Sequence, residues 1–445
     1  MVVSRDKAPT AQETFMQMAK AAGLRGRLLV TIGLLLVARF GVFIPVPGIN
    51  RARLTADVEA GNIPLIGVLD FFSGGGFSAL GIFALGILPY INASIILQLL
   101  TAAIPTLENL QKNEGEAGRR KISQITRYVA LGWGIIQSIG LSLWAQGYAN
   151  NPGTLFIAKT ALALAAGSMF VMWLSELITE RGIGNGASLL IFVNIVAVLP
   201  RTLGQTIELA QTGGREMVGK VVILLLVFLV MIIGIVFVQE GTRRIPIISA
   251  RRQVGRRLYR ERTSYLPLRL NQGGVMPIIF ASAVLILPLS LAQFTQNYSS
   301  EGFLGTISQF LAQAANQLRA DGWLYILVYL VLILFFSYFY ASLIVNPVDM
   351  SQNLKKMGAS IPGIRPGRAT SDYVEKVLNR LTFLGAIFLG LVAVVPTAVE
   401  NATGVTTFQG LGATSLLILV GVAIDTAKQV QTYVISQRYE GMVKQ

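Results

Sequence analysis

Long runs of apolar residues recur along the chain and constrain its fold more than any other feature. A helix needs about 20 mostly apolar residues to cross a bilayer, and ten runs approach that length. Only 13% of the residues are charged, about half the share in soluble domains. The chain therefore has too few charged residues to cover the surface of a water-soluble protein of this size. The sequence therefore predicts an all-α polytopic membrane protein with ten transmembrane helices. The runs lie near 28–44, 81–104, 123–145, 154–178, 185–200, 219–239, 274–293, 323–345, 377–396 and 411–430.

The amino-acid types that are missing exclude most enzyme chemistry. The chain has no Cys and no His, so thiol nucleophiles, imidazole bases and the usual zinc sites are excluded. The stretch Gly214–Val221 resembles a nucleotide-binding loop, but it lacks the Ser or Thr that binds magnesium and follows no strand. We expect no enzymatic activity, no metal and no cofactor.

Lys and Arg are concentrated in alternate connections between the runs, and this predicts the orientation in the membrane. Cytoplasmic loops are enriched in these two residues. With the N-terminus inside, 29 of the 37 basic residues fall on the cytoplasmic side and six in outside loops. We therefore expect both termini in the cytoplasm. The polar start 1–27 has no apolar core of a cleaved signal peptide and is expected to be a cytoplasmic tail.

The ten runs divide into two sets of five. We expect an N-terminal half over 28–200, an external hinge loop over 201–218, a C-terminal half over 219–430 and a cytoplasmic tail over 431–445. Such halves are often pseudo-symmetric around a pathway through the membrane. The segment 61–80 is too glycine-rich to span and too apolar for a solvated loop, which predicts a re-entrant segment.

Two cytoplasmic connections are large and basic. Connection 240–270 holds nine Arg and two Glu, and connection 346–376 contains the stretch Ile361–Gly367, in which Pro and Gly bracket Arg365. Such a stiff loop presents its Arg at a fixed position. Anchoring to anionic lipid and docking of a large cytosolic partner with an acidic or RNA surface both fit these charges.

Ionisable residues within the apolar runs are few, which argues against an ion-driven transporter. Uncharged polar residues are more numerous, and their usual role is hydrogen bonding between helices, with the lining of a watery path as the rarer alternative. The ionisable candidates are Arg39, Lys159, Glu176, Asp425 and Lys428, and the uncharged ones include Asn92, Gln98, Gln137 and Asn194.

Several stretches, in the same order along the chain, resemble the SecY family, the pore subunits of the bacterial and plastid protein translocase. The resemblance extends from the first predicted span to Tyr439. The stretches are Ile44–Gly48, Phe83–Ile91, Gly118–Ser123, Ile178–Gly186, Asn346–Pro347 and Ile361–Gly367.

The resemblance implies two five-helix halves that form an hourglass with an apolar waist, a plug helix in the re-entrant segment and a lateral gate between the halves. The implied pore ring consists of Ile87, Ile91, Ile191, Ile279 and Ile418. The implied plug residues are Leu65, Ile66, Leu69, Phe71, Phe72, Gly74, Gly75 and Gly76. The implied gate residues are Gln98, Gln137 and Asn271, and the implied motor- or ribosome-binding residues are Arg256, Arg257 and Arg365.

By the same resemblance, the expected function is a protein-conducting channel that passes unfolded preproteins and releases transmembrane segments sideways into the bilayer. The expected partners are the SecE and SecG subunits, the SecA motor ATPase, the ribosome, signal peptides, preprotein chains and membrane lipids. The expected location is the bacterial inner membrane or the thylakoid membrane. A polytopic solute carrier is the alternative and would need a polar pocket at the midplane; a scaffold protein, the third possibility, would conduct nothing.

Overall fold

The structure is a computed structural model of the chain. It describes residues 22–59, 70, 72–112, 114–249, 252–254, 257–259, 263–295, 323–404 and 413–443. The predicted plug residues Leu65, Ile66, Leu69 and Phe71 and the predicted partner-binding residue Arg256 lie outside these ranges.

Ten helices of the described residues follow the ten predicted runs in order, which confirms the predicted helical membrane fold. Seven of them are long and apolar enough to cross a membrane as single helices, and α5 forms an eighth candidate with the short helix α6, to which it is bent by 105°. The ten helices are α2 (Ala22–Phe43), α5 (Leu88–Ala103), α7 (Gly115–Ala145), α8 (Thr154–Arg181), α9 (Gly186–Thr212), α10 (Gly214–Glu240), α11 (Met276–Thr295), α13 (Trp323–Ile344), α15 (Arg368–Thr403) and α16 (Ala413–Val443). Three shorter helices are α3 (Arg51–Glu59), α6 (Pro105–Lys112) and α14 (Pro347–Lys356).

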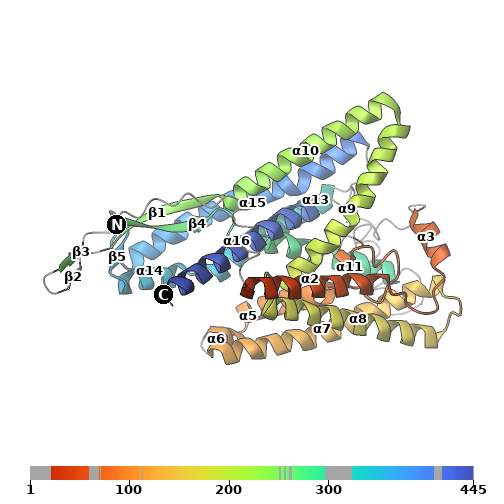
Figure 1. Cartoon of the computed structure of the whole chain (residues 1–445), viewed down its shortest axis with the longest axis horizontal. Coiled ribbons are helices and arrows are strands. Elements are labelled where there is room, and N and C mark those ends of the chain that lie inside the picture. The colour runs from red at the N-terminus through yellow and green to blue at the C-terminus, as the bar shows by residue number, and fades with distance from the viewer. Residues whose placement is uncertain are drawn as a thin grey trace.

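The helices form two halves. In the first half, α7 packs against α5 and α8, and α2 packs against α8. In the second half, α13 packs against α11 and α15, and α10 packs against α15 and α16 (Figure 1). The halves meet where α11 contacts α5 and α7 and where α16 contacts α9 and α2. One large cluster of buried apolar side chains extends through both halves.

The segment predicted as an external hinge loop is almost entirely helical, so that prediction is wrong within 201–218. The residues after Pro200 are mostly good helix formers and continue α9. The helix ends at Gly213, whose N–H donates to the Leu209 carbonyl at 2.9 Å. The next residue, Gly214, has a φ of 76°, a left-handed conformation that ends a helix and that glycine adopts readily. The link between the halves is therefore one tight turn between α9 and α10.

The second apolar run is helical only from Leu88, later than predicted. Gly86, with a φ of 53°, and Pro89 close to the helix start delay the helix. The residues before them pair with the exit of α2 instead: the Val46 N–H donates to the Leu80 carbonyl at 3.1 Å, and the Ile82 N–H donates to a carbonyl of the same exit segment at 2.9 Å. The polypeptide therefore enters α5 from a turn-rich, non-helical segment.

The turn between α8 and α9 is fixed by hydrogen bonds and by close backbone contact. Asn185 caps α9, because its side chain accepts a hydrogen bond from the Ala187 N–H at 3.0 Å. The Thr179 hydroxyl accepts from the Gly186 N–H at 2.8 Å. A Cβ on Gly186 would lie 1.9 Å from the Ser175 carbonyl oxygen. The approach of the two helices therefore requires glycine at this position.

A small sheet joins the two large basic connections, and it was not predicted from the sequence. Strand β1 pairs antiparallel with β4 and, on its other edge, with β5. Ile245 and Leu268, which belong to the sheet, pack with Ile361 and with Val374 and Leu378 of α15. The two connections, 240–270 and 346–376, therefore form one packed unit. We call the end of the molecule that carries this unit the basic end. The strands are β1 (Thr242–Ser249), β2 (Arg252–Val254), β3 (Arg257–Tyr259), β4 (Thr263–Arg269) and β5 (Ala359–Ser360).

Candidate functional site

The five isoleucines expected at the waist are all buried in the large apolar cluster. They come from both halves: Ile87 directly precedes α5, Ile91 lies in its first turn, and α9, α11 and α16 contribute one each. None exposes more than 5% of its surface. Branched apolar side chains that converge from several helices can close a narrow passage, because apolar constrictions exclude water and ions. The isoleucines are Ile87, Ile91, Ile191, Ile279 and Ile418.

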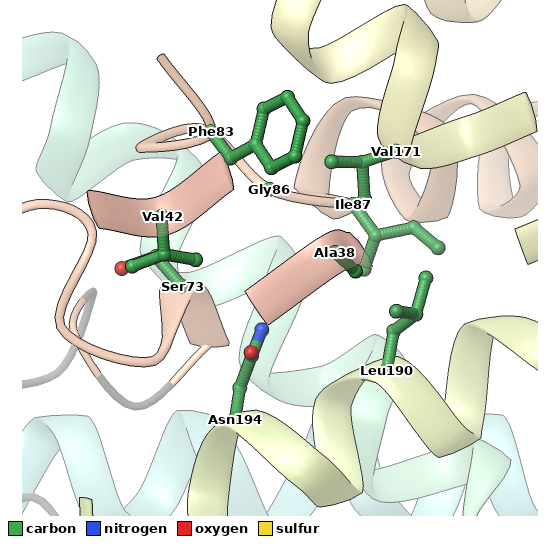
Figure 2. Close-up of a pocket in the computed structure, with 9 residues that line it drawn as sticks. All are labelled: Ala38, Val42, Ser73, Phe83, Gly86, Ile87, Val171, Leu190 and Asn194. Carbon is green, nitrogen blue, oxygen red and sulfur yellow. The ribbon is translucent and has the colours of Figure 1, made fainter. Parts of the chain in front are cut away.

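A narrow pocket lies beside one of these isoleucines, Ile87 (Figure 2). Its wall combines α2, the turn-rich segment before α5, α8 and α9. Most of the lining is apolar, and the polar side chains are those of Ser73 and Asn194. The lining residues are Ala38, Val42, Ser73, Phe83, Gly86, Ile87, Val171, Leu190 and Asn194.

Residues 72–76, the described end of the predicted plug, are held by two side chains from distant helices. The Asn194 amide of α9 donates to the Phe72 carbonyl at 2.7 Å. The Arg39 guanidinium of α2 donates to the Gly74 carbonyl. Gly74 has a φ of 68° and Gly75 a φ of 87°, conformations that favour glycine. This part of the segment is therefore fastened through its backbone.

Of the three predicted gate residues, Gln98 makes a hydrogen bond between the two halves, and no hydrogen bond joins the three to one another among the described residues. Gln98 of α5 accepts a hydrogen bond from the Tyr340 hydroxyl of α13 at 2.5 Å, which links the first half to the second. Asn271 donates to the carbonyl of Gly274 in its own segment at 2.7 Å. The Oε1 atom of Gln137 is buried and has no partner among the described residues. The sequence did not predict Tyr340, because nothing in its local pattern indicates a partner 242 residues away.

The loop with Arg365 is anchored from inside, and its Arg side chain is exposed. Ile361 is buried under the sheet. The Thr370 hydroxyl donates to the Arg365 carbonyl at 2.9 Å, and the Ser351 hydroxyl of α14 donates to the Gly367 carbonyl at 2.6 Å. The backbone of the loop is therefore fixed, and it carries the exposed Arg365 on the basic end.

The other predicted partner-binding residue in the described part of the chain is Arg257, which begins β3 and pairs with Val254.

Within the described ranges, no three acidic side chains come together in a way that could hold a metal ion.

Arg39 and Asn194 are the residues near the waist whose contact with the plug segment the sequence did not predict. The sequence alone shows Asn194 as a polar residue inside an apolar run. It follows Ile191 by three positions, and residues three apart share one face of a helix. That spacing is the signal that could have placed Asn194 next to the ring.

Comparisons with known proteins agree with this architecture. A family model described as SecY matches residues 81–427. A protein named protein translocase subunit SecY from Synechocystis sp. is 74% identical over 446 residues and covers 100% of both chains. Its namesake from Porphyra purpurea is 56% identical over 427 residues, 96% of this chain and 100% of that one.

Solved structures match over almost the whole chain at low sequence identity, so this similarity supports the fold alone. One described as a protein-conducting channel is 15% identical with a TM-score of 0.63, and covers 97% of this chain and 95% of that one. Another, described as Sec61 in the canine ribosome-channel complex from the endoplasmic reticulum, is 14% identical with a TM-score of 0.60 and the same coverage of both chains.

Proposed function

Because this chain belongs to the SecY family of protein translocase subunits and forms a protein-conducting channel, we propose how it does so. Unfolded preproteins pass through a waist ringed by the five isoleucines, and transmembrane segments leave sideways between the two halves. The observation that carries this proposal is the burial of isoleucines from both halves in one apolar cluster. Such a ring would seal against ions at rest together with the plug, and it would fit around chains of varied side chains.

The protein is a multi-pass integral membrane protein, and we propose that its basic end lies in the cytoplasm. The one-sided distribution of Lys and Arg supports this orientation. A bacterial inner membrane or a thylakoid membrane fits the family. We further propose that the chain itself performs no covalent chemistry, and that a motor, a ribosome or the membrane potential supplies the energy.

The proposed partners are the SecE and SecG subunits within the membrane and SecA or a ribosome at the basic end. Three features support docking at that end: the exposed Arg365, the anchoring of its loop by Ile361 and Thr370, and the sheet that joins both basic connections. The Sec61 relative was solved in a ribosome-channel complex. A guanidinium on a held loop suits recognition of acidic groups or phosphate, because it presents its donors in a rigid fork.

Deletion of residues 65–76 from the channel complex is expected to produce ion currents in a planar bilayer. The deletion removes the proposed plug and both backbone carbonyls that Arg39 and Asn194 hold. The waist alone would then have to seal the pore. The measurement is single-channel conductance of the purified complex with its small partners, with and without the deletion.

Large currents that appear chiefly in the deletion variant support the channel and its plug. Silence in both proteins, with folding verified by retained assembly with the small partners, would contradict the plug. It would also favour a solute carrier, which saturable flux of a small molecule would then reveal.

Replacement of Tyr340 by Phe is expected to make the gate easier to open. The variant loses the hydrogen bond to Gln98 that links the two halves, and such bonds within membranes are worth about 1 kcal/mol. The gate equilibrium should therefore shift about fivefold, which follows from that energy. The measurement is export of preproteins with weakened signal sequences.

The matched control for the gate is Tyr338→Phe, because the hydroxyl of Tyr338 donates to the Asn379 carbonyl within the second half at 3.4 Å. An equal effect of both replacements would contradict the gating role of Tyr340.

A further inference from the structure

Within the described part of the chain, two polar side chains inside transmembrane helices bind the plug segment and not a neighbouring transmembrane helix. Arg39 lies inside α2, and Asn194 lies inside α9. Polar and charged groups within a membrane protein are costly unless they are paired. Each of these two residues directs a donor at the backbone of residues 72–74, across 122 positions of sequence in the case of Asn194.

The two donors converge on a single peptide region. A Cβ built on Gly74 would lie 2.6 Å from a guanidinium nitrogen of Arg39 and 2.7 Å from Oδ1 of Asn194. Both side chains therefore surround Gly74 closely, and its φ of 68° turns the carbonyl toward Arg39. Figure 2 shows Asn194 reaching from α9 toward the segment that carries Ser73.

Each donor is held in place from its own helix. The Arg39 guanidinium lies over the Phe43 ring, 5.0 Å from its centroid and one helical turn away, a favourable cation–π arrangement. Asn194 is on the helix face that also carries Ile191 and Leu190, both buried. The donors are therefore pre-positioned, and little side-chain freedom is lost when they bind the segment.

We propose that Arg39 and Asn194 form a latch that holds the plug closed by its backbone. This inference rests on the proposed channel function and adds to it the two residues that retain the plug. The carbonyls of residues 72 and 74 exchange water for these donors on closure. A carbonyl left buried without a donor would be unfavourable, so loss of either donor shifts the plug toward a hydrated, displaced position.

The test uses the absence of cysteine from the chain. Ser73 exposes only 1% of its surface, so a Ser73→Cys replacement gives this chain one buried thiol beside the latch. The rate at which a water-soluble maleimide labels this thiol reports displacement of the plug. Labelling is measured in the reconstituted complex, together with the ion leak of the channel without a preprotein.

Arg39→Met and Asn194→Leu, each in the Ser73→Cys background, are expected to raise both the labelling rate and the leak. A single lost hydrogen bond should give a rise of about fivefold, and the charged donor a larger one. Arg39→Lys retains a charged donor and should fall between wild type and Arg39→Met. Gly74→Ala changes the plug residue that the two side chains surround. It should raise labelling as well, because its Cβ would collide with the side chains of Arg39 and Asn194.

The matched control is Thr202→Val. Thr202 is buried on the same helix as Asn194, and its hydroxyl donates to the Val198 carbonyl of that helix at 3.2 Å. This variant loses a hydrogen bond of α9 and leaves the donors to the carbonyls of residues 72 and 74 in place, so its labelling and leak should stay at the wild-type level.

The outcomes separate the latch from the channel. Unchanged labelling and leak in both Arg39→Met and Asn194→Leu, with large currents on deletion of 65–76, would overturn the latch and leave the channel standing. An equal rise in Thr202→Val would also overturn it, because general loosening would then be the cause. Silence of the deletion variant in a folded complex would overturn both proposals.

Discussion

Replacement of Arg365 by Glu is expected to slow preprotein translocation about tenfold or more, because it reverses a charge at a contact that a partner desolvates. The loop itself should keep its shape. Its anchors are the buried Ile361, the hydrogen bond from Thr370 to the carbonyl of residue 365 and the bond from Ser351 to Gly367. None of these anchors uses the guanidinium. The measurement is the initial rate of transport into vesicles with a saturating amount of motor.

Lys356→Glu is the matched control for this charge reversal. Lys356 is exposed at the end of α14, on the same basic end of the molecule. It carries the same charge as Arg365 but does not belong to the stiff loop. A specific role for Arg365 requires that Lys356→Glu retain most of the activity. Equal losses in the two variants would instead indicate a general electrostatic attraction, and full activity of Arg365→Glu would contradict docking at this residue.

Replacement of Gly186 by Ala is expected to destabilise the protein by about 2–3 kcal/mol, the usual upper range for an overpacked site. The added Cβ would lie 1.9 Å from the Ser175 carbonyl oxygen. Backbone atoms cannot move aside as a side chain can, so α8 and α9 would have to separate. The hydrogen bond between Gly186 and Thr179 would be strained as a result. The measurement is the thermal unfolding midpoint of the purified complex.

Gly204→Ala provides the comparison on the same helix. No atom lies within 4 Å of a Cβ built on Gly204. Alanine is better than glycine inside a helix by about 1 kcal/mol, so this variant should be as stable as wild type or slightly more stable. If Gly186→Ala also unfolded at the wild-type temperature, the close contact between α8 and α9 would not be needed for folding.

The sequence predicted the helices well because their apolar faces leave a strong local signal. It did not predict how far they extend. Helix α7 begins at Gly115 and α15 at Arg368, each several residues before the apolar run. These first turns are polar and project beyond the apolar layer, where hydropathy gives no signal. The same limit explains the wrong hinge loop: the residues after Pro200 are too polar to count as a span, yet they are good helix formers.

The sheet and the contacts around the plug could not be predicted because both depend on partners far away in sequence. Strand β1 alternates only partly, since Arg243 and Arg244 interrupt the apolar pattern, and its stability comes from β4, β5 and the cluster on α15. The five isoleucines were identified through family resemblance and not through their own pattern. Arg39 and Asn194 were visible as polar residues, but only the fold brings them to residues 72–74.

The way residues 72–74 are held has a consequence for how the amino-acid sequence of this segment can evolve. Arg39 and Asn194 bind carbonyl oxygens, and every amino acid has the same carbonyl. A replacement of the buried Phe72 that keeps its apolar packing would leave both bonds in place. Position 74 is constrained to glycine by its φ of 68° and by the two side chains around it. Selection for these two bonds therefore acts on Arg39 and Asn194, while the packing of the core constrains the buried side chains of residues 72 and 73.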